Sequence, residues 1–93
     1  MNTKRWTVVF RVLANPNRLK IIELLSRNDA MNVGEITDYL GISFTSTSNH
    51  LVILKNIDVL EARGTSGHVF YSLNKMLPKD FHKIIISVLK FSD

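Results

Sequence analysis

The most constraining feature of the sequence is a pair of short helical patterns that meet at a glycine. Residues 34–40 (GEITDYL) have their apolar side chains at helical spacing. Gly41 follows directly and predicts a left-handed helix cap, because glycine has no side chain that clashes in that conformation. Ser43 is a suitable N-cap for a second helix over residues 43–56. Two helices joined by a turn of about four residues around a glycine predict a helix-turn-helix motif.

The second helix (SFTSTSNHLVILKN) begins with a run of hydroxyl side chains. Five of the six residues 43–48 carry a hydroxyl, and such residues have poor helix propensity. Leu51 and Leu54, with the methyl group of Thr47, form an apolar stripe. Short hydroxyl and amide side chains can reach base edges and phosphates without filling the major groove. A DNA-reading helix is therefore one interpretation, and the solvated face of an ordinary amphipathic helix is the other.

Strand-like segments follow the second helix. Residues 59–63 and 68–73 flank the sequence Gly-Thr-Ser-Gly at positions 64–67, which predicts a β-hairpin with two glycines that are free to take positive φ. Residues 30–33 could form a further short extended segment. A hairpin directly after a helix-turn-helix motif makes a wing. A plain hairpin that covers the edge of the core is the alternative.

Three further helices are predicted, over residues 3–13, 16–27 and 79 to about 91. Asn15 can cap the second of these, and Pro16 suits its first position. The last helix is more apolar than a cover over a small core requires, so we expect it to form a dimer interface with the first helix. Completion of the core of a single chain is the alternative. The predicted interface residues are Trp6, Val9, Phe10, Leu13, Phe81, Ile84, Ile85, Val88 and Leu89.

Composition is consistent with one domain and excludes several kinds of site. Residues 1–93 have no Pro-rich or Gly-rich interval, and 45% of them are apolar, which suffices for one modest core. The net charge of +4 favours a polyanionic partner. The absence of cysteine excludes disulfides, thiolate metal sites and a cysteine nucleophile. No apolar run approaches the ~20 residues that cross a bilayer, so we expect a cytoplasmic protein with no membrane partner.

Three blocks of the chain also carry a family resemblance. The blocks are LANPNRLKIIELL at 13–25, GEITDYLGIS at 34–43 and SNHLVILKNIDVLEARGTSGHVFYSL at 48–73. They resemble the Pro-Thr-Arg-Leu-type second helix, the recognition helix and the wing of the ArsR-type (arsenic-repressor-like) winged helix-turn-helix transcriptional regulators. The resemblance implies a mainly α fold with a small β-hairpin, and a homodimer that binds double-stranded DNA as a repressor. Two recognition helices about 34 Å apart would favour an inverted-repeat operator.

The residues expected to contact DNA follow from these patterns and from the resemblance. Asn49 is the best candidate to read a base, because its amide can pair bidentately with adenine. Asn49 stands where the family usually has Arg, and Phe44 and Thr45 stand where it usually has Gln-Pro. These departures bear on base preference and not on the binding mode. His50 falls on the family's His-Leu pair and is expected to pack or to lie near a phosphate. The full predicted set is Arg18, Lys20, Ser43, Phe44, Thr45, Ser46, Ser48, Asn49, His50, Lys55, Arg63, Thr65, Ser66 and His68.

The resemblance raises the question of metal sensing. The family's thiolate site would fall near Asn32 and Gly34, where the chain has no cysteine. A second family pattern, on the last helix, is matched in part by Asp80, His82 and Asp93, which could hold a divalent ion across a dimer. We interpret Asp80 instead as a first-turn residue favoured by the helix dipole and His82 as a surface residue, so no metal or cofactor is expected. No Ser-His-Asp spacing or phosphate-binding glycine loop indicates an enzyme. The alternative function is a winged-helix module that binds a protein without specific DNA binding.

Overall fold

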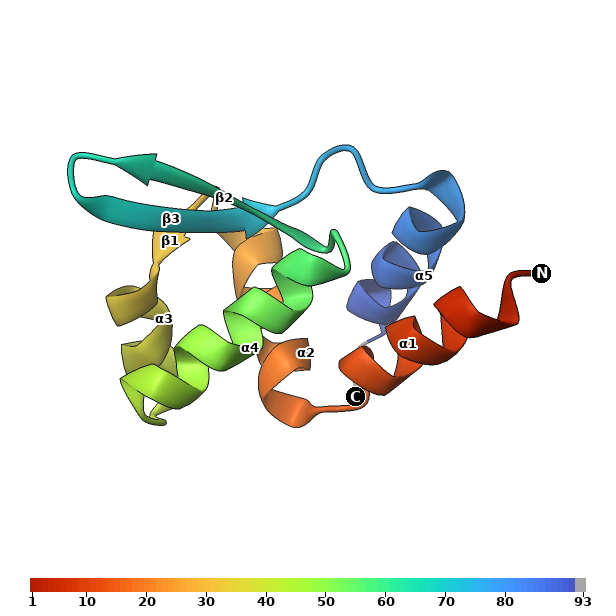
Figure 1. Ribbon diagram of the computed structural model, residues 1–93, viewed down its shortest axis with the longest axis horizontal. Helices are drawn as coiled ribbons and strands as arrows, with labels where there is room; N and C mark the ends of the chain where they lie inside the picture. Colours follow the sequence, from red (N-terminus) through yellow and green to blue (C-terminus); the bar gives the residue numbers. More distant parts are fainter. Residues whose placement is uncertain (92–93) are drawn as a thin grey trace.

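The computed structural model describes residues 1–91, which form five helices and a small antiparallel sheet (Figure 1). This confirms the expected winged helix-turn-helix architecture. No helix among these residues combines the length and apolarity that a membrane span needs. The elements are α1 (Thr3–Leu13), α2 (Pro16–Arg27), β1 (Met31–Asn32), α3 (Val33–Leu40), α4 (Phe44–Asn56), β2 (Leu60–Thr65), β3 (His68–Leu73) and α5 (Lys79–Lys90).

Side-chain caps set where the helices begin. Asn15 Oδ1 accepts from the backbone N–H of Asn17 and of Arg18, at 3.0 and 3.2 Å, with Pro16 as the first residue of α2. Asn32 and Glu35 form a reciprocal capping box at the start of α3. These local bonds explain why polar residues stand between the apolar runs.

The turn of the helix-turn-helix motif has the predicted geometry. Gly41 ends α3 with φ 67°, and its N–H donates to the carbonyl oxygen of Thr37. Ser43 then caps α4, because its Oγ accepts from the N–H of Ser46 at 3.0 Å. The direction of α4 is therefore set by two local devices, a left-handed glycine and a serine cap.

The hairpin differs from the prediction in its turn. The strand β2 runs to Thr65, which pairs with His68, so the connection has only two residues. Those two, Ser66 and Gly67, have φ of 51° and 80°, the double positive φ of a type I′ hairpin. Gly64 lies inside β2 opposite Val69 and does not supply a turn conformation. The extended segment β1 pairs with β3, giving the sheet order β1-β3-β2.

The core lies where the five helices and the sheet meet. Leu51, Leu54 and Thr47 of α4 are fully buried, as predicted. Val12 and Leu24 also belong to the core, although the sequence patterns did not place them there. The buried apolar residues are Val9, Val12, Leu13, Ile21, Ile22, Leu24, Leu25, Ile36, Leu51, Leu54, Val59, Leu60, Tyr71, Phe81 and Ile85.

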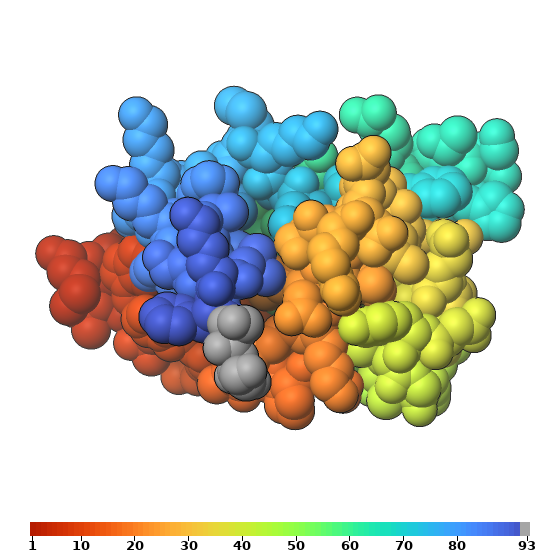
Figure 2. Space-filling view, turned by 180° about the vertical axis from the view of Figure 1, so that it is seen from behind, coloured from red at the N-terminus to blue at the C-terminus, as the bar shows by residue number. Residues whose placement is uncertain are grey.

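Helix α5 packs against α1 within one chain, which corrects part of the predicted dimer interface. Seen from behind, α5 lies between α1 and α2 (Figure 2). Val9, Leu13, Phe81 and Ile85 are buried in the core of the single chain and leave little surface for a partner. The alternative that α5 completes the core of a single chain accounts for these four residues. Of the remaining five, Phe10 and Val88 are exposed, whereas Trp6, Ile84 and Leu89 are half-buried.

Candidate nucleic-acid interface

The exposed face of α4 carries short polar side chains, as the sequence predicts. Thr45 and Asn49 are exposed, and Ser46 and Ser48 are half-buried. Thr47 turns inward, where its hydroxyl donates to the carbonyl oxygen of Ser43 at 2.9 Å. The outer surface of the helix start is therefore free to approach a ligand, while Thr47 fastens the same turn from inside.

Two apolar residues interrupt this polar face. Phe44 is 59% exposed at the first position of α4, and Val52 is 47% exposed. Val52 lies three residues after Asn49 and seven after Thr45, so the three share one helical face. The sequence patterns gave Val52 no role, although this spacing could have identified it. An apolar side chain among polar ones is suited to a thymine methyl group.

The wing lies on the same side of the molecule as the start of α4. A surface groove is lined by Phe44 together with Gly67, His68 and Val69 of the wing and the beginning of α3. Arg63, Thr65, Ser66 and His68 are all exposed along the hairpin. The wing tip and the α1–α5 pair lie at opposite ends of the molecule (Figure 1). One extended ligand can thus touch both α4 and the wing without meeting α5.

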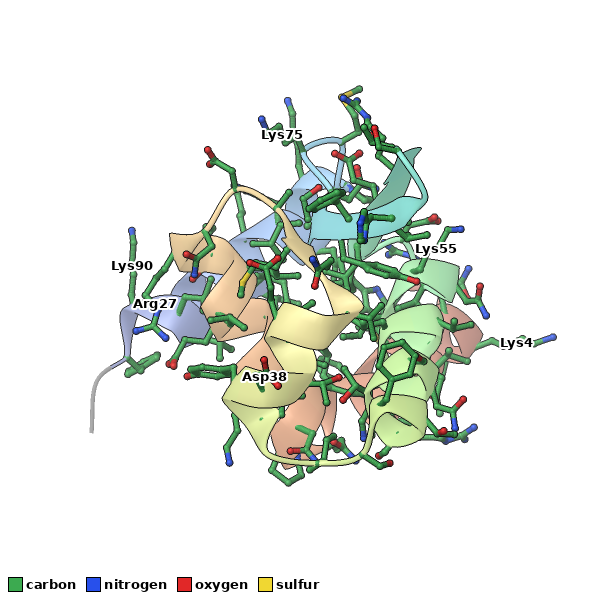
Figure 3. The ribbon with its side chains drawn as sticks, turned by 90° about the vertical axis from the view of Figure 1, so that its left-hand side faces the viewer. Lys4, Arg27, Asp38, Lys55, Lys75 and Lys90 are labelled. Atoms are coloured by element: carbon green, nitrogen blue, oxygen red, sulfur yellow. The ribbon has the colours of Figure 1, made fainter. Side chains whose placement is uncertain are left out.

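Basic side chains accompany this surface. Lys20 and Lys55 are exposed, as a phosphate contact requires. Figure 3 shows Lys55 and Lys4 pointing outward on the side where α4 lies, whereas Arg27 and Lys90 extend from the opposite side. Lys4 was not among the predicted DNA contacts. Its exposure and direction make it a further candidate for a phosphate contact.

Arg18 is not the free surface residue that a phosphate contact requires. Its side chain is half-buried, and Nη1 donates to the carbonyl oxygen of Val12 at 3.0 Å. Its Nε donates to Nδ1 of His50 at 3.1 Å. Arg18 thus joins the end of α1 and the middle of α4, and in this arrangement both bonds hold its guanidinium inside the protein. Burial, and secondly the positive charge of Arg18, lower the pKa of His50 below its ordinary value of 6.5.

This lowered pKa predicts that acid destabilises the fold. The unfolded chain binds a proton at His50 as the pH falls through about 6.5, whereas the folded chain resists protonation until a lower pH. The unfolded state therefore holds more protons in this window, and the free energy of unfolding falls as the pH falls. Urea unfolding at a series of pH values between 8 and 5 measures the effect. The decline should be shallower in the His50→Asn variant, and an equal decline in both chains contradicts the assignment to His50.

The residues matched to the family's metal pattern on α5 have other contacts. Asp80 Oδ2 accepts from Arg5 Nη1 at 3.2 Å, and Oδ1 accepts from the N–H of Phe81 at 2.7 Å. The Phe81 N–H, followed by Arg5, lowers the pKa of Asp80. His82 is exposed, and Asp93 lies outside the described residues. Within residues 1–91 there is no cluster of three His, Cys, Asp or Glu side chains that could hold a metal ion.

A helix-turn-helix motif with an exposed hairpin beside its second helix defines the winged-helix class of protein. The sequence pattern of the family described as bacterial regulatory protein, arsR family, matches residues 15–62. The chain belongs to this family of DNA-binding transcriptional regulators, which is not a class of enzymes.

Relatives in this family include both repressors and activators. The chain is 38% identical over 72 residues to the transcriptional repressor SdpR of Bacillus subtilis, covering 77% of this chain and 79% of SdpR. The structure of HlyU from Vibrio cholerae, named as a transcriptional activator, superposes with a TM-score of 0.78 at 27% identity, over 95% of this chain and 94% of that one. The homodimeric winged helix-turn-helix domain of Mb0332 from Mycobacterium bovis gives a TM-score of 0.77 at 27% identity, over 91% and 75%.

Proposed function

We propose that this regulator binds an inverted-repeat operator as a cytoplasmic homodimer and represses transcription by occluding a promoter. Helix α4 enters the major groove, and the wing lies along the backbone or in the minor groove. The observation that carries the proposal is the groove in which Phe44, at the start of α4, faces the tip of the wing, with Thr45 and Asn49 exposed on the same helix. Short polar side chains on the helix and basic ones around it match base edges and phosphates respectively.

The proposed dimer uses the apolar surface that α1 and α5 leave uncovered. Phe10 and Val88 are 54% and 52% exposed, and Trp6 stacks beside Phe10 with ring centroids 5.7 Å apart. Burial of this surface against a second copy removes it from water, and the homodimeric Mb0332 domain is a precedent for such an assembly. Two copies then present two α4 helices to successive major grooves.

Within this proposal, Asn49 reads a base and Thr45, Ser46 and Ser48 contact bases or phosphates. Lys20 and Lys55 hold phosphates, and Arg63, Thr65, Ser66 and His68 follow the backbone from the wing. Val52 and Lys4 extend the set. The rival function is a winged-helix module whose α4 and wing contact a protein, with the net charge of +4 being incidental.

Arg63→Ala tests the DNA interface of the wing. Removal of one phosphate contact weakens binding to all duplexes alike. It also makes the negative slope of log K against log[salt] shallower by about 1. Fluorescence anisotropy of labelled duplexes between 50 and 300 mM salt measures both quantities. Arg27→Ala is the matched control, because this exposed arginine extends from the side opposite α4 (Figure 3).

Three results of that salt titration show whether the chain binds duplex DNA and whether the wing takes part. The proposal expects a steep fall of affinity with salt for the unmodified chain, a smaller slope for Arg63→Ala and no change for Arg27→Ala. An unaltered slope in Arg63→Ala removes the wing from the interface. No duplex binding even at low salt supports the protein-binding module instead.

A further inference from the structure

Arg18 links three helices at the base of the proposed recognition helix. It projects from the first turn of α2, donates from Nη1 to the Val12 carbonyl oxygen in α1 at 3.0 Å, and donates from Nε to His50 Nδ1 in α4 at 3.1 Å. Both bonds are part-buried. The position of the His50 ring is therefore set by α1 and α2 as well as by its own helix.

The same contact determines which nitrogen of His50 carries the hydrogen. A guanidinium group only donates, so Nδ1 must present its lone pair to Arg18. The neutral imidazole then has its hydrogen on Nε2. Within residues 1–91, no protein atom accepts a hydrogen bond from Nε2, although the ring is only half-buried. The Nε2–H is available to an acceptor from outside the chain.

A phosphate oxygen suits this donor better than a base edge. His50 follows the exposed Asn49 but is itself half-buried against α2, so its ring sits at the flank of α4 rather than at its crest. Phosphates line the rim of the major groove, beside the flanks of a helix, whereas base edges lie at the floor. Donation from Arg18 also polarises the ring and strengthens Nε2–H as a donor. A bond from this group to an anionic oxygen is charge-assisted.

We propose that Arg18 is a positioning residue that holds His50 in the tautomer whose Nε2–H donates to a DNA phosphate, and is not itself a phosphate ligand. The inference rests on the proposed DNA-binding function. It reassigns Arg18, which the sequence patterns place among the phosphate contacts. It also gives His50 a directed role at the flank of α4.

Salt dependence separates positioning from direct contact. Arg18→Ala should lower affinity for duplex DNA about ten-fold, as expected for loss of one charged hydrogen bond, while the slope of log K against log[salt] stays unchanged. Lys20→Ala is the matched comparison, because this exposed residue two positions along α2 is a proposed phosphate contact. Its loss should reduce the magnitude of the slope by about 1. Anisotropy titrations of a labelled duplex give both values.

Two histidine variants test the two ring nitrogens separately. Asparagine places an amide oxygen near the position of Nδ1, so His50→Asn keeps the acceptor for Arg18 but lacks the outward donor. We expect this variant to keep its urea midpoint at pH 8, where His50 is neutral, and to lose about ten-fold in affinity. His50→Asn also tests the phosphate contact of His50 if Arg18→Ala does not fold. In the free wild-type chain, ¹⁵N NMR should show the hydrogen of neutral His50 on Nε2, and in Arg18→Ala a mixture of tautomers.

The contrary outcomes are distinct. If the slope of log K against log[salt] becomes shallower by about 1 in Arg18→Ala, Arg18 is a phosphate ligand and the proposal is overturned. Full affinity in His50→Asn, or a hydrogen on Nδ1 in the free chain, overturns it equally. If the wild-type chain binds no duplex at low salt, the proposed function fails and the phosphate contact fails with it. A correct tautomer in that case leaves the Arg18–His50 bond as a purely structural tie.

Discussion

Leu51→Ala should lower the free energy of unfolding by about 2 to 5 kcal/mol. Leu51 is fully buried at the centre of the contact between α4 and the rest of the core. Truncation exposes no new surface but leaves a cavity whose lining loses its packing partners. Small domains are stable by only about 5 to 15 kcal/mol, so the loss is a large fraction of the total.

The hydroxyl-rich start of α4 makes this residue especially important. Residues with short polar side chains contribute little to helix stability, so α4 depends on packing through Thr47, Leu51 and Leu54. Urea unfolding followed by circular dichroism measures the effect. Val52→Ala is the control, because the neighbouring Val52 is largely exposed and its truncation should change stability by about 0.5 kcal/mol or less. A loss below about 1 kcal/mol in Leu51→Ala contradicts the close packing of Leu51 in the core.

Asn49→Ala should relax sequence choice at one base pair by about 1 to 3 kcal/mol. Asn49 is exposed on the outer face of α4, and its amide offers a donor and an acceptor to one base edge. Its loss therefore reduces the preference for one base over the other three while the remaining contacts persist. Arg63→Ala, in contrast, should weaken binding to every sequence equally.

Competition binding across operator variants measures this difference. A panel of duplexes that differ at one position at a time should show one flattened position for Asn49→Ala and an unchanged pattern for Arg63→Ala. Equal losses on all sequences for both variants would refute the division between base reading and backbone contact. The thermal midpoint of each variant, measured alone, separates a loss of contact from a loss of folding.

Features that depend on neighbouring residues were predictable from the sequence. The caps at Asn15 and Ser43 and the left-handed Gly41 each follow from bonds or dihedral angles within a few residues. The sequence predicts the hairpin but places its turn at residues 64–67, because glycines stand at both ends of that segment. Ser66 rather than Gly64 takes positive φ, because pairing of Ala62 with Tyr71 sets the register and leaves only two residues to turn.

Features that depend on distant residues were not predictable. Apolar side chains occur around most of α1, so the choice of Val12 over Phe10 for the core depends on how α1 packs against α2 and α5. Likewise, the basic character of Arg18 suggested a phosphate contact, but its partner His50 lies 32 residues further along the chain. Only the three-dimensional arrangement brings Arg18 of α2 within hydrogen-bond distance of His50 of α4.

Selection of bound sequences from a random double-stranded DNA pool tests the central claim most directly. If two α4 helices of a homodimer read successive major grooves, the enriched sequences share an inverted repeat with half-site centres about 10 bp apart, or a multiple of that spacing. The same selection with Asn49→Ala should lose preference at one position in each half-site. Enrichment of no sequence, or of a motif without two-fold symmetry, would contradict the account.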